Sequence, residues 1–395
     1  MIVRQFIEWV RGARAQERAE ERAEATAALA RAYIYSELSP EDHSAAEGAM
    51  LVLLDDPWPL VRQALADVLG ASPNAPAAVV YALAGDLPEI AAPVLALSPL
   101  LVDADLIDAV ATGGSMVQSA IASRAALPRS VAAAVAEVGA AEACLVLLNN
   151  RDADIAPFSL DRIVERYGHL GEIREPLTAR DDLSAAARQA LVTKLGESLA
   201  GYAVGREWLD VDNALRNARE ACEKMTVALA ARTPDAEMQP LVRHLRESGQ
   251  LTADLILRAL LSGNAAFFEG ALAELTGVPL RRVSALIYDS SLSGARALFH
   301  KAGLPPSTYP AFREAIKVMR EGGFVSEPKG IARLKRRMIE RVLSRYDSKE
   351  LGERAPLITL QHRFATEAAR EEARRFCDEL VFKDYGAHRR QRVAA

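Results

Sequence analysis

The chain has 395 residues, of which 50% are hydrophobic and 6% aromatic, so a sizeable buried core is possible. No charge-free apolar stretch of 18 residues occurs, and the first residues lack the apolar segment and cleavage site of a signal peptide. The three cysteines, Cys144, Cys222 and Cys377, lie far apart, which favours buried free thiols over a disulfide framework. Composition therefore excludes a membrane-spanning or disulfide-stapled protein, and we expect a cytoplasmic one.

Charge is unevenly distributed, although the net charge is only −5. Lys and Arg number 10 against 21 Asp and Glu in residues 1–160, 21 against 20 in residues 161–320, and 17 against 12 in residues 321–395. The acidic first part favours a basic partner, and the basic last part favours an anionic one.

The first part, residues 1–44, is predicted to form N-terminal capping helices. Residues 2–38 carry a short apolar stripe followed by a charged run, which is typical of a terminal helix that covers the first repeat of an array. A partner-binding helix is the alternative. Ser39, Pro40 and Asp42 then mark the start of another helix, because they fit its cap, first and third positions.

Residues 45–160 repeat one pattern. Val61, Ile90 and Val117 occupy equivalent places at spacings of 29 and 27 residues, a period typical of stacked helical repeats. Each repeat reads as a pair of helices separated by proline-rich turns, and its apolar face is too wide to be buried within one pair. We therefore predict an all-α fold, an α-solenoid of stacked antiparallel helix pairs.

The first repeat resembles a HEAT repeat at Asp56, Val61, Arg62 and Ala64. In that family the Asp caps a helix and the Arg braces the turn of a neighbouring repeat, so the resemblance implies structural roles for both residues. The second repeat has Ala91 where the first has the Arg.

A wider resemblance covers two blocks of the chain. Residues 38–113, with LSPED, DDPWPLVRQALA and AVATGG, and residues 251–304, with LTADLILRALLSGN and ALAELTGVPLRRVSALI, are similar to the bacterial domain of unknown function 2336. The resemblance implies a HEAT-like helical protein and supplies no established activity.

Residues 161–325 are predicted to form a second helical region. Glycines and prolines break short helices near residues 168–184, whereas residues 186–200 indicate an amphipathic helix and residues 209–232 another long helix. This region is expected to end in a C-terminal helical bundle, followed by basic C-terminal helices and a tail in residues 326–395.

The basic segment near residue 337 is the candidate site for an anionic partner. Ile331, Leu334, Met338 and Val342 recur at helical spacing, so one face of this helix docks and the other is cationic. Nucleic acid, an anionic membrane surface and an acidic protein are possible partners; a solvated face paired with neighbouring acids is the alternative. The cationic residues are Lys329, Arg333, Lys335, Arg336, Arg337, Arg341 and Arg345.

Two short motifs also bear on nucleotide binding. The motif D-x-S-x-x-G is matched by Asp289, Ser291 and Gly294, and the motif R-x-x-x-R is matched by Arg337 and Arg341. These two motifs resemble those with which PilZ domains bind cyclic di-GMP. Their order is reversed here and no β-barrel is predicted around them, so chance occurrence is the simpler interpretation. A cyclic dinucleotide stays among the possible anionic ligands.

Catalytic constellations are absent from the sequence. The six histidines lack zinc-binding spacing, and neither a G-x-S-x-G nor a Walker-type motif occurs, so we expect no catalytic residues, no metal and no cofactor. Asp103, Asp105 and Asp108 are explained by the start of a helix, where carboxylates favour the dipole. HEAT-like glycosylases act on DNA through a basic, aromatic surface, whereas residues 45–160 are acidic with one tryptophan, Trp58. We expect a non-enzymatic protein-binding scaffold or adaptor, with a nucleic-acid or anionic-ligand binder as the alternative.

Overall fold

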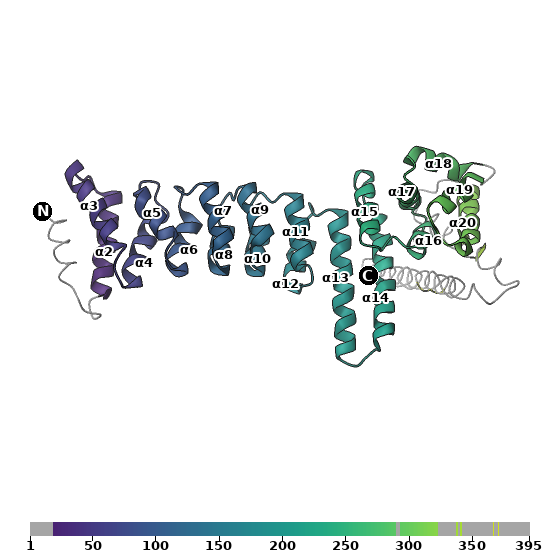
Figure 1. Cartoon of the computed structure of the whole chain (residues 1–395), viewed down its shortest axis with the longest axis horizontal. Helices are drawn as coiled ribbons and strands as arrows, with labels where there is room; N and C mark the ends of the chain where they lie inside the picture. Colours follow the sequence, from purple (N-terminus) through teal and green to yellow (C-terminus); the bar gives the residue numbers. More distant parts are fainter. Residues whose placement is uncertain are drawn as a thin grey trace, which may run out of the picture. The chain divides into compact units, whose positions relative to one another are not determined.

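The computed structural model describes residues 19–289 and 293–322, together with Arg337, Met338, Glu340, Arg341, Thr366 and Arg370. Within these residues all regular structure is helical (Figure 1). The chain divides into two compact units between Leu191 and Val192. The all-α prediction is thus confirmed for the described residues, whereas the four-part division of the chain stays a prediction.

The first unit contains eleven described helices before the long helix α13, arranged in two layers (Figure 1). Each even-numbered helix contacts the next even-numbered one, and α3 contacts α5, α7 contacts α9 and α9 contacts α11. We call this arrangement the row. Its even layer is α2 (Ala19–Tyr35), α4 (Pro59–Leu69), α6 (Pro88–Leu97), α8 (Ser115–Ala122), α10 (Ala141–Asn149) and α12 (Gly171–Thr178). Its odd layer is α3 (Pro40–Leu53), α5 (Ala77–Ala84), α7 (Asp103–Thr112), α9 (Arg129–Val138) and α11 (Pro157–Tyr167).

Prolines and a serine cap set the starts of several row helices. The Ser39 hydroxyl accepts a hydrogen bond from the Asp42 N–H at 3.1 Å, which confirms the predicted start of α3. Pro40, Pro59 and Pro88 stand in the first turn of α3, α4 and α6, where the missing N–H costs nothing. The local sequence therefore determines where the helices begin.

A continuous apolar core runs through the row. Val61 and Leu65 of α4, Val79 of α5 and Ile90 of α6 are all buried, and the same core extends to Leu191. Most of its members are Ala, Val and Leu, and small side chains let neighbouring helices approach closely. The period of buried residues is the one that the sequence predicted.

The second unit begins within α13 (Ala185–Gly205), which is joined by a short loop to α14 (Val211–Ala230). α17 (Ala265–Thr276) contacts α15, α16, α18 and α19, and α16 contacts α14 and α20. The remaining helices are α15 (Asp235–Glu247), α16 (Ala253–Leu261), α18 (Leu280–Tyr288), α19 (Ser293–Lys301) and α20 (Tyr309–Gly322), with a short 3-10 turn at Pro306–Thr308. Both predicted helices are present, as α13 over residues 185–205 and α14 over residues 211–230.

Aromatic side chains fill the centre of the second unit. The rings of Phe268 and Phe312 lie 6.0 Å apart between centroids, and those of Phe299 and Phe312 lie 4.7 Å apart. Gly277 ends α17 with a φ of 66°, a left-handed conformation that glycine adopts without strain. The chain can therefore turn directly from α17 into α18.

Candidate protein-binding surfaces

Arg62 joins two successive repeats of the row. Its Nε and Nη2 donate to the Asp86 carboxylate at 2.6 and 2.9 Å, and its Nη1 donates to the Asp56 carbonyl oxygen at 2.7 Å. Burial raises the pKa of Asp86, but hydrogen bonds from Arg62 and from the Leu87 N–H outweigh it, so the pKa lies below its ordinary value. The bracing contact that the resemblance implied for Arg62 is present.

Arg22 repeats this arrangement one helix pair earlier. Its Nε and Nη2 donate to the two Asp56 carboxylate oxygens, both at 3.2 Å, and its side chain is buried. Asp56 in turn accepts from the Trp58 N–H at 2.9 Å, just as Asp86 accepts from the Leu87 N–H at 2.7 Å. Asp56 thus fixes the backbone immediately before α4. The sequence did not identify Arg22, because its partner lies 34 residues away.

Arg124 and Asn150 hold helix ends further along the row. Arg124 donates to the carbonyl oxygens of Leu95 and Ser98 at 2.6 and 2.8 Å, at the C-terminus of α6. Asn150 donates to the carbonyl oxygens of Ala122 and Arg124, both at 2.8 Å, where α8 ends. Carbonyl groups at a helix end lack intrahelical partners, so these side chains satisfy them.

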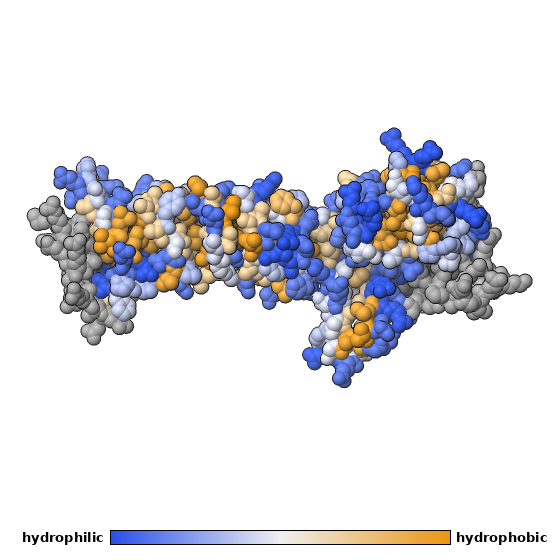
Figure 2. Space-filling model, viewed as in Figure 1, coloured by the Kyte–Doolittle hydropathy of each residue, from blue (hydrophilic) through white to orange (hydrophobic). Residues whose placement is uncertain are grey.

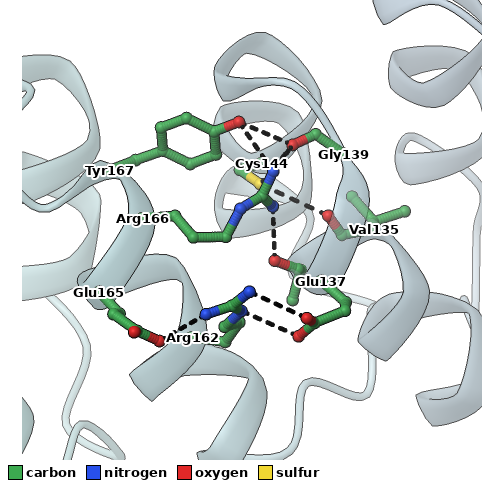
Figure 3. A network of polar contacts seen from close by, with 9 residues as sticks. Val135, Glu137, Gly139, Cys144, Arg162, Glu165, Arg166 and Tyr167 are labelled. Atoms are coloured by element: carbon green, nitrogen blue, oxygen red, sulfur yellow. Dashed lines mark hydrogen bonds and ion pairs between the residues drawn. The ribbon is translucent and has the colours of Figure 1, made fainter.

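Arg166 plays the same part between α11 and α9 (Figure 3). It donates to the carbonyl oxygens of Ala136 and Gly139 at 2.7 and 2.8 Å, and the Tyr167 hydroxyl also donates to Gly139 at 2.9 Å. A cation at the C-terminus of a helix is favoured by the helix dipole. Beside it, Arg162 forms ion pairs with Glu137 and Glu165 (Figure 3). These side chains are more exposed, so their ion pairs contribute less to stability.

The cysteine thiols in the described residues are structural. Cys144 is fully buried next to this network, and burial raises the pKa of its thiol to about 11 (Figure 3). Burial also raises the pKa of Cys222, with a further contribution from Glu197 and Glu223. Both thiols are free and stay protonated at neutral pH, so neither has the lowered pKa of a reactive cysteine. Cys377 lies outside the described residues.

Most arginine side chains in the middle of the row are engaged in contacts with other residues of the row. Residues 39–160 contain 15 Asp and Glu against only four arginines, Arg62, Arg124, Arg129 and Arg151. The first two are bound inside the row, and Arg129 donates to Asp154 at 3.0 and 3.1 Å. The surface of this segment is consequently dominated by carboxylates.

The outward surface of α5, α7 and α9 combines these carboxylates with apolar side chains, and we call it the odd face. Tyr81 and Val138 are exposed, as are small residues at helical spacing on α5 and α7. α5 and α7 contain no Lys, Arg or His. The exposed members of the odd face are Ala77, Ala78, Tyr81, Ala82, Asp103, Ala104, Asp108, Ala111, Thr112, Arg129, Ser130, Glu137 and Val138.

The odd face is a candidate protein-binding surface. Exposed apolar area rimmed by polar groups marks interaction sites, and alanines allow close approach of a partner backbone. The sequence offered one signal for it, since the segment AAVVYALA of α5 is apolar on every side and a helix of that kind is normally covered.

Other aspartates of the odd layer are explained locally. Asp105 accepts from the Val102 N–H at 3.0 Å, and Asp103 accepts from the Ser130 hydroxyl at 2.6 Å. The first contact closes the start of α7, and Asp103 and Asp105 lie in its first turn, as the sequence predicted. Asp108 lies in the second turn, so the prediction was wrong for this residue. Within the described residues, no group of three His, Cys, Asp or Glu side chains is placed to hold a metal ion.

The basic segment is only partly described. Arg337, Glu340 and Arg341 are exposed, and Met338 is fully buried. Lys329, Arg333, Lys335, Arg336 and Arg345 lie outside the described residues.

The D-x-S-x-x-G motif is also incomplete in the structure, because Ser291 lies outside the described residues. A Cβ at Gly294 would lie 2.7 Å from Leu286 Cδ2, so this glycine allows α19 to approach α18. Its structural role is explained without a nucleotide.

Comparison with known proteins gives one match. A family model described as "Uncharacterised protein conserved in bacteria (DUF2336)" matches residues 90–351, more than half of the chain. No curated protein and no solved structure matches the chain. Among the described residues, no helix combines the length and apolar character needed to span a membrane.

Proposed function

The chain belongs to the bacterial DUF2336 family, and we propose that it is a non-enzymatic scaffold that binds a basic protein on its odd face. In this proposal the row is a HEAT-like solenoid, whose stacked helix pairs offer an extended surface to a partner. The cytoplasm is the proposed compartment, because free thiols such as Cys144 and Cys222 suit a reducing environment.

One observation carries the proposal: the odd face joins exposed apolar residues to carboxylates, and α5 and α7 supply no cation. Tyr81 is a large, half-exposed aromatic side chain surrounded by alanines, and aromatic residues of this kind anchor protein interfaces. Asp103 and Asp108 of α7, the next helix of the odd layer, supply negative charge. Charges of one sign on such a face select a partner of the opposite sign and speed its association.

A site-specific cross-link tests the odd face. A photoreactive phenylalanine analogue replaces Tyr81 in the full chain, and a matched variant carries it at Tyr35, another exposed tyrosine of the row. Native lysate is treated with nuclease before illumination, and cross-linked proteins are identified by mass spectrometry. We expect a basic protein cross-linked from position 81 and not from position 35.

Charge reversal separates the odd face from general acidity. Asp108→Lys should lower the yield of the cross-link from position 81 at least tenfold, and added salt should lower it gradually. Glu172→Lys, at an exposed acid of α12 outside the odd face, should leave the yield unchanged. The same adducts from positions 81 and 35, or equal effects of the two reversals, would refute the proposal.

A second candidate function is the binding of nucleic acid or another anionic ligand, including a cyclic dinucleotide, through the basic segment. It is favoured by the exposure of Arg337 and Arg341 on either side of the buried Met338. Titration of labelled single-stranded and duplex DNA, RNA and cyclic di-GMP at several salt concentrations tests it. Binding that weakens steeply with salt and is lost in the Arg337→Glu, Arg341→Glu double variant would support this function.

A further inference from the structure

The helical hairpin of residues 192–230, formed by α13 and α14 within the second unit, is held together by small residues. A Cβ at Gly196 would lie 2.5 Å from Cys222 Sγ, and the Cys222 thiol donates to the Val192 carbonyl oxygen at 3.5 Å. Ala200 of α13 and Ala214 of α14 are also buried. The two helices therefore approach closely through Gly, Ala and Cys, and their large apolar side chains are not needed for this contact.

Those large side chains are exposed instead. Leu195, Leu199 and Tyr202 lie at positions i, i+4 and i+7 of α13, which places them in one stripe. The Trp208 ring extends the stripe over the loop, because its centroid lies 5.6 Å from that of Tyr202 in an edge-to-face contact. Figure 2 shows an apolar area on this hairpin. The other exposed apolar residues of the hairpin are Leu209, Val211, Leu215 and Met225.

The hairpin exposes a large apolar area in total. A half-exposed side chain of this size contributes on the order of 100 Å², so the eight residues, spread over both helices and the loop, together expose roughly 800 Å². Two such hairpins together reach the range of about 1,200–2,000 Å² that a specific interface buries. The area is thus of the size that pairing of two equal hairpins requires.

Charge selects among possible occupants. Residues 192–230 contain five Lys and Arg against six Asp and Glu, a net charge of −1, so the hairpin offers little attraction to nucleic acid, an anionic membrane or a strongly charged protein. Near-neutral surfaces of mixed charge do not repel their own copies. A two-fold symmetric contact uses the same surface on both subunits, and two antiparallel helices with an open apolar face make half of a four-helix bundle.

We propose that the hairpin is a homodimerisation element, in which the stripe Leu195–Leu199–Tyr202–Trp208 of one chain packs against the hairpin of a second copy. This inference is independent of the odd face. A dimer would present two odd faces and could hold two copies of a basic partner.

Sedimentation equilibrium and light scattering of the full chain over a concentration series test the proposal. The wild-type protein should be dimeric at micromolar concentration, and Leu199→Glu should raise the dissociation constant at least tenfold. Leu97→Glu is the matched control, because Leu97 on α6 is 60% exposed and Leu199 is 59% exposed. It should leave the dimer unchanged.

Tryptophan fluorescence gives a second readout at the interface itself. Trp208 is 69% exposed in the single chain, so its emission should shift to shorter wavelength as concentration rises, and the shift should be absent in Trp208→Phe. Circular dichroism verifies that each variant is folded. A monomeric wild-type protein at 100 micromolar, or a dimer that Leu97→Glu dissociates and Leu199→Glu does not, would overturn the proposal.

Discussion

The row and the second unit bury their apolar residues in different ways. In the row, small side chains form a core that is extended repeat by repeat, and arginines such as Arg22 and Arg62 connect each repeat with the next. In the second unit, Phe268, Phe299 and Phe312 meet at one aromatic centre. Stability in the row should therefore be a sum of neighbour contacts, whereas the second unit should depend on its centre as a whole.

The two regions also use buried charge differently. Asp86 of the row is held ionised by Arg62, so its pKa is lowered. In the second unit, burial raises the pKa of Glu223, and the Asp254 and Glu220 carboxylates add to this, although Arg258 lies 3.4 Å away and opposes it. Burial likewise raises the pKa of Asp254. The pKa of Asp86 in the row is thus lowered by its arginine partner, whereas the pKa values of Glu223 and Asp254 in the second unit are raised by burial.

The largest expected effect comes from the aromatic centre. Phe268→Ala should destabilise the second unit by about 3–5 kcal/mol, because it removes a fully buried ring and leaves a cavity. Hydrogen exchange followed by mass spectrometry should show loss of protection throughout α16–α20, with α4–α8 unchanged. Phe158→Ala, at an exposed phenylalanine of the row, is the control and should have little effect. Equal loss of protection in α4–α8 would mean that the stability of the row also depends on the aromatic centre, and would contradict the comparison.

Arg62→Ala should have the next largest effect, about 2–4 kcal/mol, because it leaves the mostly buried Asp86 carboxylate and the Asp56 carbonyl oxygen without this donor. If stability in the row is local, hydrogen exchange should accelerate most in α4 and α6 and progressively less toward α12. Arg151→Ala, at an exposed arginine of the same region, should change little. Uniform acceleration along the whole row would contradict the repeat-by-repeat account.

The smallest effect is a difference in pH dependence. The stabilisation from Asp86 is complete above its ordinary pKa of about 4 and is lost as pH falls toward the lower folded value. Asp86→Asn should therefore destabilise α4–α6 by about 1–2 kcal/mol at pH 7, and its difference from the wild-type protein should shrink as pH falls below about 4. Local opening free energies from hydrogen exchange at both pH values provide the measurement.

Glu223 should behave in the opposite sense. Its pKa is raised in the fold, so its contribution is most favourable at low pH and declines as pH rises above the ordinary value of about 4. Glu223→Gln keeps the neutral shape and should change the stability of α14–α16 by less than about 1 kcal/mol at pH 7. Destabilisation by this variant as large as that from Asp86→Asn would remove the contrast between the two units.

The interaction surfaces were less predictable than the helices. The acidic excess of residues 1–160 was visible in the sequence, but the odd face was not, because exposure of Tyr81 and of the α5 alanines depends on which side of the helix its neighbours cover. Similarly, residues 209–232 were predicted as a long helix that carries Leu215, and this leucine is exposed, because α13 and α14 meet through Gly196, Ala218 and Cys222. Hydrophobic periodicity identifies an apolar face without saying what covers it.

The sequence by itself determined the all-helical character, the helix starts at Ser39, Pro59 and Pro88, and the buried period of Val61, Ile90 and Val117, because caps, prolines and apolar spacing act over a few residues. Only the tertiary structure decided the partners of Arg22, Arg62, Arg124 and Arg166 and the exposure of Trp208. An arginine side chain can meet a carboxylate or a helix end anywhere along the chain. Its partner depends on distances that helix packing creates, and no local pattern records them.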